Sequence, residues 1–276
     1  MKETIIVLEN VTKKYDKDII FSNVSLNINK GESIAIVGKN GKGKSTFLRV
    51  ISGLTKIEEG NITYSRKLKF NFVPENFTRL NITAREYISL IADIEGINKK
   101  DLKEKLKYLV KEFFLEDMMD TPIKFLSKGT IQKVSVLQAL FIKPDVLLLD
   151  EPLSGQDIAS QRNFIKIVKS LIKNDVTVLM ACHETLLIKE LSNRVLEIDN
   201  KSINEVSKDD LKDINVSTMV FVNDIGLKSF LDENSEKVIS FNEEDDEITI
   251  KVSSDISNEF LKEIINHGYI LRYYEE

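Results

Sequence analysis

Short apolar runs alternate along this chain with longer segments whose apolar residues recur every three or four positions. Up to Pro74, alternating or continuous apolar stretches predict five strands, namely Thr4–Leu8, Ser25–Ile28, Ser33–Val37, Gly60–Tyr64 and Leu68–Val73. One helix is predicted between the third and fourth of these strands, where Phe47–Ser52 reads as its first turns. The opening part of the chain is therefore expected to be rich in strands.

After Pro74 the spacing of apolar residues becomes helical. Thr83 is followed three positions later by Glu86, which is a capping-box pattern, and a helix is expected to start there. Two further helices are predicted, one over Asp101–Phe114 and one that begins near Thr130. Residues 76–142 are thus expected to form a helical insertion in an α/β core.

The core is expected to resume at Val146–Leu149, a continuous apolar run of the kind found in a parallel strand covered on both faces. Helices and strands then alternate, with helices predicted at Ile158–Lys173 and Thr185–Leu191 and strands at Val176–Ala181 and Val195–Ile198. Such alternation predicts a mostly parallel sheet.

Beyond about Asn204 the order of predicted elements is β-α-β-β-α-β. The segments are Thr218–Val222, Leu227–Leu231, Val238–Phe241, Ile248–Val252, Asn258–His267 and Tyr269–Tyr274, with the acidic run Glu243–Glu247 as a hairpin loop. This order is that of ferredoxin-like domains. The chain is therefore expected to divide into residues 1–205 and a small α+β domain of residues 206–276; the alternative is an irregular extension packed on the core.

The composition excludes some classes of protein but does not identify a reaction. Hydrophobic residues make up 42% of the 276 positions and charged residues 30%, as in an ordinary globular protein. The 39 basic and 44 acidic residues leave a net charge of −5, which provides no footprint for nucleic acid. The single cysteine excludes an internal disulfide. With neither a signal-peptide core nor a run of about 20 apolar residues, the chain is expected to be cytoplasmic.

The most informative stretch is Gly38–Thr46, which follows an apolar strand and opens a helix. It matches the phosphate-loop pattern G-x-x-x-x-G-K-[ST] in the structural context that the pattern requires. Glycines allow backbone N–H groups to face phosphate oxygens, and the helix N-terminus adds positive potential. Lys44 is expected to reach the β- and γ-phosphates, and the Ser45 hydroxyl to hold Mg²⁺. The stretch therefore predicts a nucleoside triphosphate site.

A pair of acids, Asp150 and Glu151, ends the apolar run Val146–Leu149. The carboxyl ends of parallel strands are where open α/β sheets bind ligands. Asp150 is placed to hold hydrated Mg²⁺, and Glu151 is placed as the general base for an attacking water. The alternative, a polar loop without chemistry, is less compatible with the phosphate loop on the same chain.

Taken together, these motifs resemble the nucleotide-binding subunits of ABC transporters over about residues 3–205. Gly38–Thr46 is similar to the family's Walker A motif, and Val146–Asp150 followed by Glu151 to Walker B. Leu126–Thr130 resembles the signature L-S-G-G-Q, and Leu153–Asp157 resembles the D-loop. His183 falls at the switch histidine, and Tyr15 at the aromatic residue that stacks on adenine.

The resemblance implies an ABC cassette of the P-loop NTPase class: a RecA-like parallel sheet, an antiparallel β subdomain and a helical insertion. It also implies an ATP hydrolase that uses Mg²⁺ and closes head-to-tail as a homodimer or with a paired cassette. Ser127, Lys128 and Gly129 would then contact ATP bound by the partner. Separately encoded transmembrane permease subunits are implied as partners, at the inner face of the cell membrane. The implied nucleotide contacts are Tyr15, Gly38, Asn40, Gly41, Gly43, Lys44, Ser45 and Thr46, with Glu151, His183 and Lys44 catalytic.

Three positions depart from the family pattern. Glu75 stands where the family has a glutamine that contacts Mg²⁺, and it is expected to serve as a metal ligand beside Ser45 and Asp150. In the signature, Lys128 replaces a glycine and Thr130 replaces a glutamine. We interpret these changes as marks of an active subfamily rather than as damage. A lone cassette with such a signature and a C-terminal extension most resembles exporters of peptides, antibiotics or ions.

Two other function classes were weighed. A nontransport ABC ATPase acting on DNA or ribosomes is disfavoured because the insertion has no sustained heptads and the single-cassette chain is acidic. A small-molecule phosphotransferase would have no use for the signature segment or for His183. No nucleic-acid partner is therefore expected.

Overall fold

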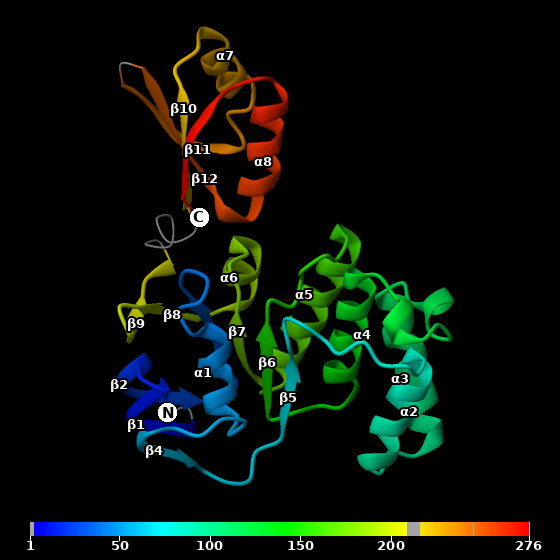
Figure 1. Cartoon of the computed structure of the whole chain (residues 1–276). Coiled ribbons are helices and arrows are strands. Elements are labelled where there is room, and N and C mark those ends of the chain that lie inside the picture. The colour runs from blue at the N-terminus through cyan, green and yellow to red at the C-terminus, as the bar shows by residue number, and fades with distance from the viewer. Residues whose placement is uncertain (1–2, 209–215, 245, 276) are drawn as a thin grey trace. The chain divides into compact units, whose positions relative to one another are not determined.

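The computed structural model describes residues 3–208, 216–244 and 246–275 (Figure 1). The chain forms two compact units: residues 1–182 with 187–205, and residues 206–276 together with the short segment 183–186. In the described part of the chain, none of the helices combines the length and the apolar character that crossing a membrane demands.

The first unit contains a three-stranded antiparallel sheet in the order β2-β1-β4. Its strands are β1 (Thr4–Tyr15), β2 (Asp18–Asn29) and β4 (Glu59–Tyr64). Leu8 pairs with Leu26 as the two predicted strands require, but both strands run much further than their apolar segments. Polar residues of Lys13–Ile20 are drawn into the hairpin because backbone pairing, not side-chain hydrophobicity, extends it.

A six-stranded sheet in the order β5-β6-β7-β3-β8-β9 forms the centre of the unit. Its strands are β3 (Ser33–Val37), β5 (Phe70–Val73), β6 (Val146–Asp150), β7 (Thr177–Ala181), β8 (Arg194–Asp199) and β9 (Ser202–Val206). The pairs β5–β6, β6–β7, β7–β3 and β3–β8 are parallel, as the alternation of elements predicts. Every residue of β3, β6 and β7 is buried, which explains their continuous apolar runs.

The helices of this unit outside the segment between β5 and β6 are α1 (Lys44–Ile51), α5 (Ile158–Lys173) and, from Leu187 onward, α6 (Thr185–Leu191). Phe47, Leu48 and Ile51 of α1 are fully buried in one apolar cluster that also contains residues of the antiparallel sheet and of β3, β6 and β7. The helix that follows the phosphate loop is therefore anchored between the two sheets. Because β3 leads directly into that loop, the loop is held at both ends by buried elements.

The segment between β5 and β6 is helical, as its spacing predicts. It contains α2 (Ala84–Ile94), α3 (Lys99–Glu112), α4 (Lys128–Phe141) and two 3₁₀ turns, Glu116–Met118 and Ile123–Phe125. The predicted capping box is present at the start of α2: the Thr83 hydroxyl accepts from the Glu86 N–H, and the Glu86 carboxylate accepts from the Thr83 N–H. The third helix starts at Lys128, two residues before its predicted start, because Ser127 caps it.

The second unit has the strand order β11-β12-β10-β13 with all neighbours antiparallel. Its elements are β10 (Val216–Val222), α7 (Ile225–Glu233), β11 (Val238–Glu244), β12 (Glu247–Ser253), α8 (Ser254–Asn266) and β13 (Leu271–Glu275). This connectivity is that of the split βαβ arrangement. Its own core includes Phe221, Phe230, Ile250 and Phe260, so the unit buries apolar surface independently.

Two further sequence-based expectations differ from the structure. β9 was not predicted, because its sequence is polar and only its position at the sheet edge makes it a strand. The acidic run Glu243–Glu247 is not a loop over its whole length: Glu244, the last residue of β11, pairs with Glu247, the first residue of β12, and Asp245 lies outside the described residues.

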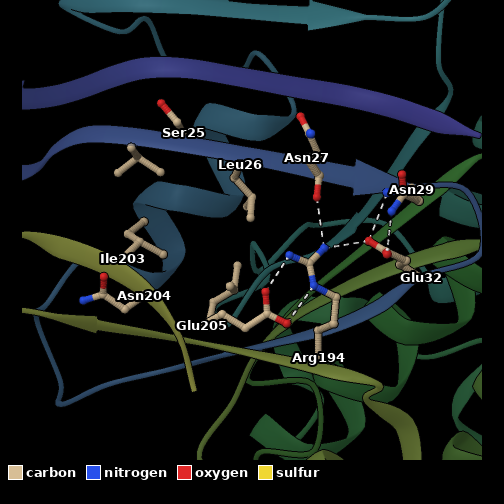
Figure 2. A pocket seen from close by; sticks show the side chains of 11 residues that line it. Ser25, Leu26, Asn27, Asn29, Glu32, Arg194, Ile203, Asn204 and Glu205 are labelled. Carbon is tan, nitrogen blue, oxygen red and sulfur yellow. Dashed lines mark hydrogen bonds and ion pairs between the residues drawn. The ribbon is translucent and has the colours of Figure 1, made fainter. Parts of the chain in front are cut away.

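A polar network ties β2 and β3 to β8 and β9 around Arg194. Its guanidinium donates to the Asn27 carbonyl (3.0 Å), to Glu32 (2.9 Å) and to both oxygens of Glu205 (3.1 and 2.9 Å), as Figure 2 shows. Burial alone would raise the pKa of Glu32, but hydrogen bonds from Asn29 and Arg194 outweigh it and lower the pKa. These residues line a cavity of about 510 Å³, and its charged groups are paired with one another. The network is structural.

We expect Arg194→Met to lower the free energy of unfolding by about 1–3 kcal/mol, because Glu32 would stay largely buried without its cation. Urea denaturation at pH 7 measures the change. The control is Arg66→Met, which removes a bidentate partner of Asp145 from an exposed site and should have a much smaller effect. Equal losses in the two variants would contradict a special role for Arg194.

Candidate functional site

The phosphate loop lies between β3 and α1, where the sequence predicts it. Gly38 has φ of 143°, and a Cβ there would lie 2.6 Å from the backbone oxygen of Ile198, so no larger residue fits without a shift. Lys44 is 7% exposed, and its amine donates to the Gly38 carbonyl at 2.8 Å, with Asn40 Oδ1 at 3.5 Å. The lysine is thus folded back over the loop that it follows. Gly41 is exposed at the tip, while Gly43, Ser45 and Thr46 are half-buried.

Residues that are 105 positions apart meet at the end of this loop. The Ser45 hydroxyl donates to Asp150 Oδ1 at 2.8 Å, which joins the start of α1 to the carboxyl end of β6. Both are predicted Mg²⁺ ligands, and a hydroxyl with a carboxylate is the oxygen donor set that Mg²⁺ prefers. The structure therefore places the two strongest motifs of the sequence in direct contact.

Asp150 is only 2% exposed, and burial raises its pKa to about 6. The Ser45 hydrogen bond and Arg49 oppose this shift, whereas the negative charges of Glu75 and Glu151 add to it. The carboxylates of Glu75 and Glu151 therefore both repel that of Asp150. Such a cluster is favourable once a cation is bound, and costly without one. The residues present fit a divalent cation.

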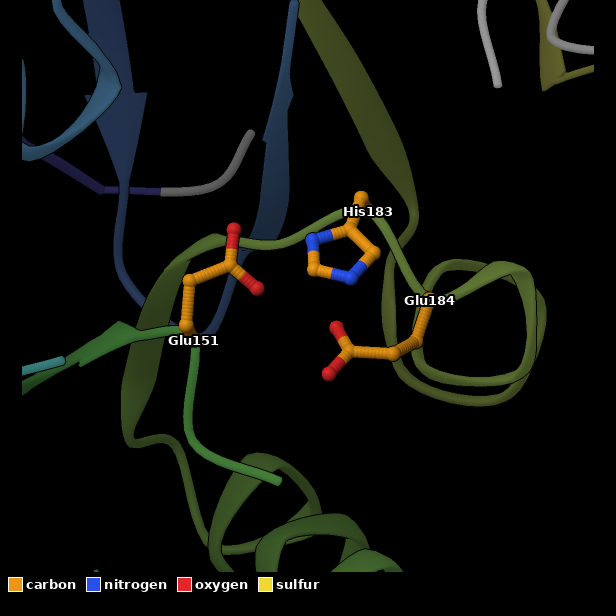
Figure 3. A group of neighbouring side chains, drawn as sticks. All are labelled: Glu151, His183 and Glu184. Carbon is orange, nitrogen blue, oxygen red and sulfur yellow. The ribbon is translucent and has the colours of Figure 1, made fainter. Parts of the chain in front are cut away.

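Glu151 adopts a left-handed backbone conformation, with φ of 47°. Its N–H donates to the Ala181 carbonyl at 2.9 Å, and its carbonyl accepts from the Ser154 N–H at 3.3 Å. A residue with a Cβ in this region is strained, and such strain is often found where a side chain must be aimed. Figure 3 shows Glu151 with His183 and Glu184; one oxygen or nitrogen of each lies within 4.8 Å of the others.

Tyr15 is the last residue of β1 and is 45% exposed, so its ring is accessible to a planar base. The Lys13 ammonium lies 4.5 Å from the centre of that ring and also pairs with Glu58 at 2.9 Å. The ring is thereby oriented at the rim of the antiparallel sheet. The residue type alone would suggest a core or a surface aromatic, and the exposure of Tyr15 excludes the core position.

The signature segment begins α4. Ser127 is exposed and caps the helix: its hydroxyl accepts from the Thr130 N–H at 3.2 Å and lies 2.8 Å from the Thr130 hydroxyl. Lys128 is exposed beside it. Gly129 approaches the D-loop so closely that a Cβ would lie 2.0 Å from the Gly155 carbonyl oxygen. The glycine is required here because the two segments are packed backbone to backbone.

Contacts of α4 with the site were missed by sequence reasoning. Lys133 pairs with Asp157 at 2.6 Å, and the pKa of Asp157 is lowered, first by this hydrogen bond and then by its contacts with Ser160. Gln132 is 3% exposed and donates to the Pro74 carbonyl (3.2 Å) and the Glu151 carbonyl (3.4 Å). The only sequence signal was a glutamine among buried apolar positions of a helix.

Comparisons with known proteins agree with this geometry. A family described as "ABC transporter" matches residues 21–154. The zinc import ATP-binding protein ZnuC of Rickettsia bellii is 34% identical over 200 residues, which is 71% of this chain and 83% of that protein. The O-antigen export system ATP-binding protein RfbB of Klebsiella pneumoniae is 30% identical over 190 residues, which is 69% of this chain and 77% of that protein.

Solved structures extend the likeness to the fold. A dimeric ATP-binding cassette in a post-hydrolysis state with ADP and Pi has a TM-score of 0.67 and 25% identity, over 74% of this chain and 99% of that one. Another ATP-binding subunit of an ABC transporter has a TM-score of 0.68 and 23% identity, over 75% and 91%. The α/β fold with its phosphate loop, the motif order and the relatives agree. This chain belongs to the ATP-binding subunits of ABC transporters, which bind and hydrolyse ATP.

Proposed function

We propose that this subunit closes head-to-tail around Mg–ATP, as a homodimer or with a paired cassette, and so drives separately encoded permease subunits. The observation that carries the proposal is the 2.8 Å hydrogen bond between Ser45 and Asp150, which supports a single triphosphate site built from both Walker motifs. The exposed Ser127 at the N-terminus of α4 supports a contact outside its own subunit.

In this proposal the phosphate loop and Tyr15 bind the nucleotide, with the N–H groups of Gly38–Thr46 facing phosphate oxygens. The Glu151 carboxylate orients a water for in-line attack on the γ-phosphorus and takes its proton. The bond to the bridging oxygen then breaks and ADP leaves. Lys44 and His183 stabilise the negative charge that develops on the transferred group.

Ser45, Asp150 and Glu75 are the residues that would hold Mg²⁺, through one hydroxyl and two carboxylates. The bound cation would supply neutralisation of charge on the β- and γ-phosphate oxygens. Glu75 is exposed, and its charge already contributes to the raised pKa of Asp150, which supports its place in this group. A carboxylate instead of the family's amide adds one negative charge to the donor set.

The trans contact is assigned to Ser127, Lys128 and Gly129. The close approach of Gly129 to Gly155 supports a rigid presentation of this segment, because the D-loop backs it directly. Lys128 adds a positive side chain at the positive end of a helix, where the γ-phosphate of ATP bound by the partner would be attracted.

Export is the proposed direction, with the subunit in the cytoplasm on the inner face of the membrane. Glu75, the Lys-Gly signature and the C-terminal extension support it, whereas the related proteins carry names of both import and export systems. Residues 206–276 are proposed as a separate domain. The independent apolar core of that unit supports this division.

The experiment is light scattering of purified Glu151→Gln protein with and without Mg–ATP. A mass that doubles only with Mg–ATP is expected, because the signature segment of each copy would complete the site of the other. A second variant, Ser127→Arg with Glu151→Gln, should stay monomeric with ATP. Failure of ATP to change the mass, at concentrations that saturate binding, would overturn the homodimer.

A further inference from the structure

Two glutamines on α4 donate hydrogen bonds to the core, but only one of them reaches the end of β6. Gln132 is 3% exposed, and its Nε2 lies 3.2 Å from the backbone oxygen of Pro74 and 3.4 Å from that of Glu151. A carboxamide nitrogen carries two hydrogens, so each carbonyl can receive one of them. Both acceptors are carbonyls, and the orientation of the amide is therefore determined by them.

The two carbonyls belong to the segments that carry site carboxylates. Pro74 directly precedes Glu75, and the second acceptor is the carbonyl of Glu151 itself. One side chain of the helical insertion thus connects the end of β5 with the end of β6. A relative shift of these two ends would have to stretch or break one of the two hydrogen bonds.

The backbone of Glu151 is held from three directions. Its N–H donates to Ala181, and its carbonyl accepts from the Ser154 N–H as well as from Gln132. These contacts fix the peptide groups on both sides of a Cα whose φ of 47° is unfavourable for glutamate. Since the direction of the Cα–Cβ bond follows from the two peptide planes, these contacts also set the direction in which the Glu151 side chain leaves the backbone.

We propose that Gln132 is a positioning residue for ATP hydrolysis, which keeps the Glu151 carboxylate aimed by holding its carbonyl together with that of Pro74. This inference rests on the proposed role of Glu151 as the general base. Both hydrogen bonds are longer than the typical 2.9 Å, so they contribute little to stability. Bonds of this kind tighten in the reactive complex, and a small misplacement of a catalytic group can cost about 100-fold in rate.

Gln138 provides a matched control. It lies on the same helix, and its Nε2 donates to the Phe72 carbonyl of β5 at 2.9 Å. It therefore makes the shorter bond to the same part of the sheet, but it is directed at β5 rather than at the segment after β6. If α4 affected hydrolysis only through its attachment to the core, loss of the Gln138 amide would lower kcat at least as much as loss of the Gln132 amide.

The experiment measures steady-state ATP hydrolysis and thermal unfolding of Gln132→Met and Gln138→Met, each alone and combined with Glu151→Gln. We expect Gln132→Met to lower kcat about 10- to 100-fold with KM for ATP changed less than about 3-fold. Gln138→Met should keep kcat within about 2-fold while lowering Tm at least as much. In the Glu151→Gln background, Gln132→Met should cause no further loss, because its effect passes through the missing base.

Three results would overturn the inference: unchanged kcat in Gln132→Met, a change confined to KM, or an equal fold loss with and without Glu151. Full turnover in Glu151→Gln alone would instead overturn the proposed base, so the two failures are distinguishable. Should Gln132→Met fail to bind ATP or to unfold cooperatively, Gln132→Asn replaces it. That variant keeps the amide but is one methylene shorter, and the same criteria apply to it.

Discussion

Replacing Glu151 by glutamine is expected to cut ATP turnover by about 100-fold or more while leaving ATP binding intact. The amide has nearly the same shape but cannot accept the proton of the attacking water at neutral pH. The Glu151 backbone contacts do not involve the side chain, so the local fold should persist. Phosphate release and the dissociation constant for ATP, measured on the same preparation, separate chemistry from binding.

The control for this prediction is Glu104→Gln, the same chemical change at an exposed position of α3. It should retain turnover within about 2-fold, because surface substitutions away from binding sites, helix caps and buried networks usually have small effects. If Glu151→Gln turned over ATP at a rate close to that of the unmodified protein, Glu151 would not be the general base.

Asp150→Asn is expected to abolish Mg²⁺-dependent hydrolysis and, at the same time, to stabilise the nucleotide-free protein at pH 7. The pKa of the buried Asp150 carboxyl is raised from 3.8 to about 6, so the folded state holds this proton more tightly than the unfolded chain does. The contribution of Asp150 to the free energy of unfolding is therefore lost as pH rises from about 4 to about 6. At pH 7 the buried carboxylate destabilises the folded state by the full amount. That cost is at most about 3 kcal/mol.

The measurement is urea denaturation of both proteins without Mg²⁺ or nucleotide, at pH 7 and near pH 4.5. Asparagine can still accept the Ser45 hydrogen bond through its Oδ1 and has no charge to bury. The gain in free energy of unfolding should be about 1–3 kcal/mol at pH 7 and should shrink markedly at the lower pH. A gain that does not depend on pH would show that burial of the charge is not its cause.

Asp157→Asn is the matched control because its shift has the opposite sign. The pKa of Asp157 is lowered by Lys133 and by its capping contacts with Ser160, so it contributes stability above its ordinary pKa that is lost as pH falls. This variant should be destabilised at pH 7. Opposite signs in two carboxyl-to-amide changes on the same chain would identify the environment, not the substitution, as the cause.

The phosphate loop and the Asp150–Glu151 pair could be located from the sequence because each of them is local in the chain. The phosphate loop needs a buried strand, a glycine turn and a helix start within about 20 residues, and Ser33–Ile51 contains all three. The same holds for Asp150 and Glu151 after the apolar run of β6. Turn conformation and burial of short segments depend mainly on neighbouring residues, and such features are predictable.

Contacts between residues that are distant in the sequence could not be predicted from local patterns. β9 is a strand only because β8 offers it an edge, and β1 and β2 extend through polar residues because each pairs with the other. Gln132 lies on the buried side of α4. Its two acceptors can be identified only once β5 and β6 are known to lie side by side. Nothing in the order of residues encodes these distances directly.

The sequence by itself determined the family, the ATP chemistry and most of the order of the elements, since these depend on local patterns of apolar, glycine and charged residues. Only the tertiary structure decided that Ser45 meets Asp150, that burial raises the pKa of that carboxyl to about 6, and that Gly129 lies against Gly155. The physical reason is that hydrogen bonds, desolvation and close packing act between groups that are near in space, whatever their separation along the chain.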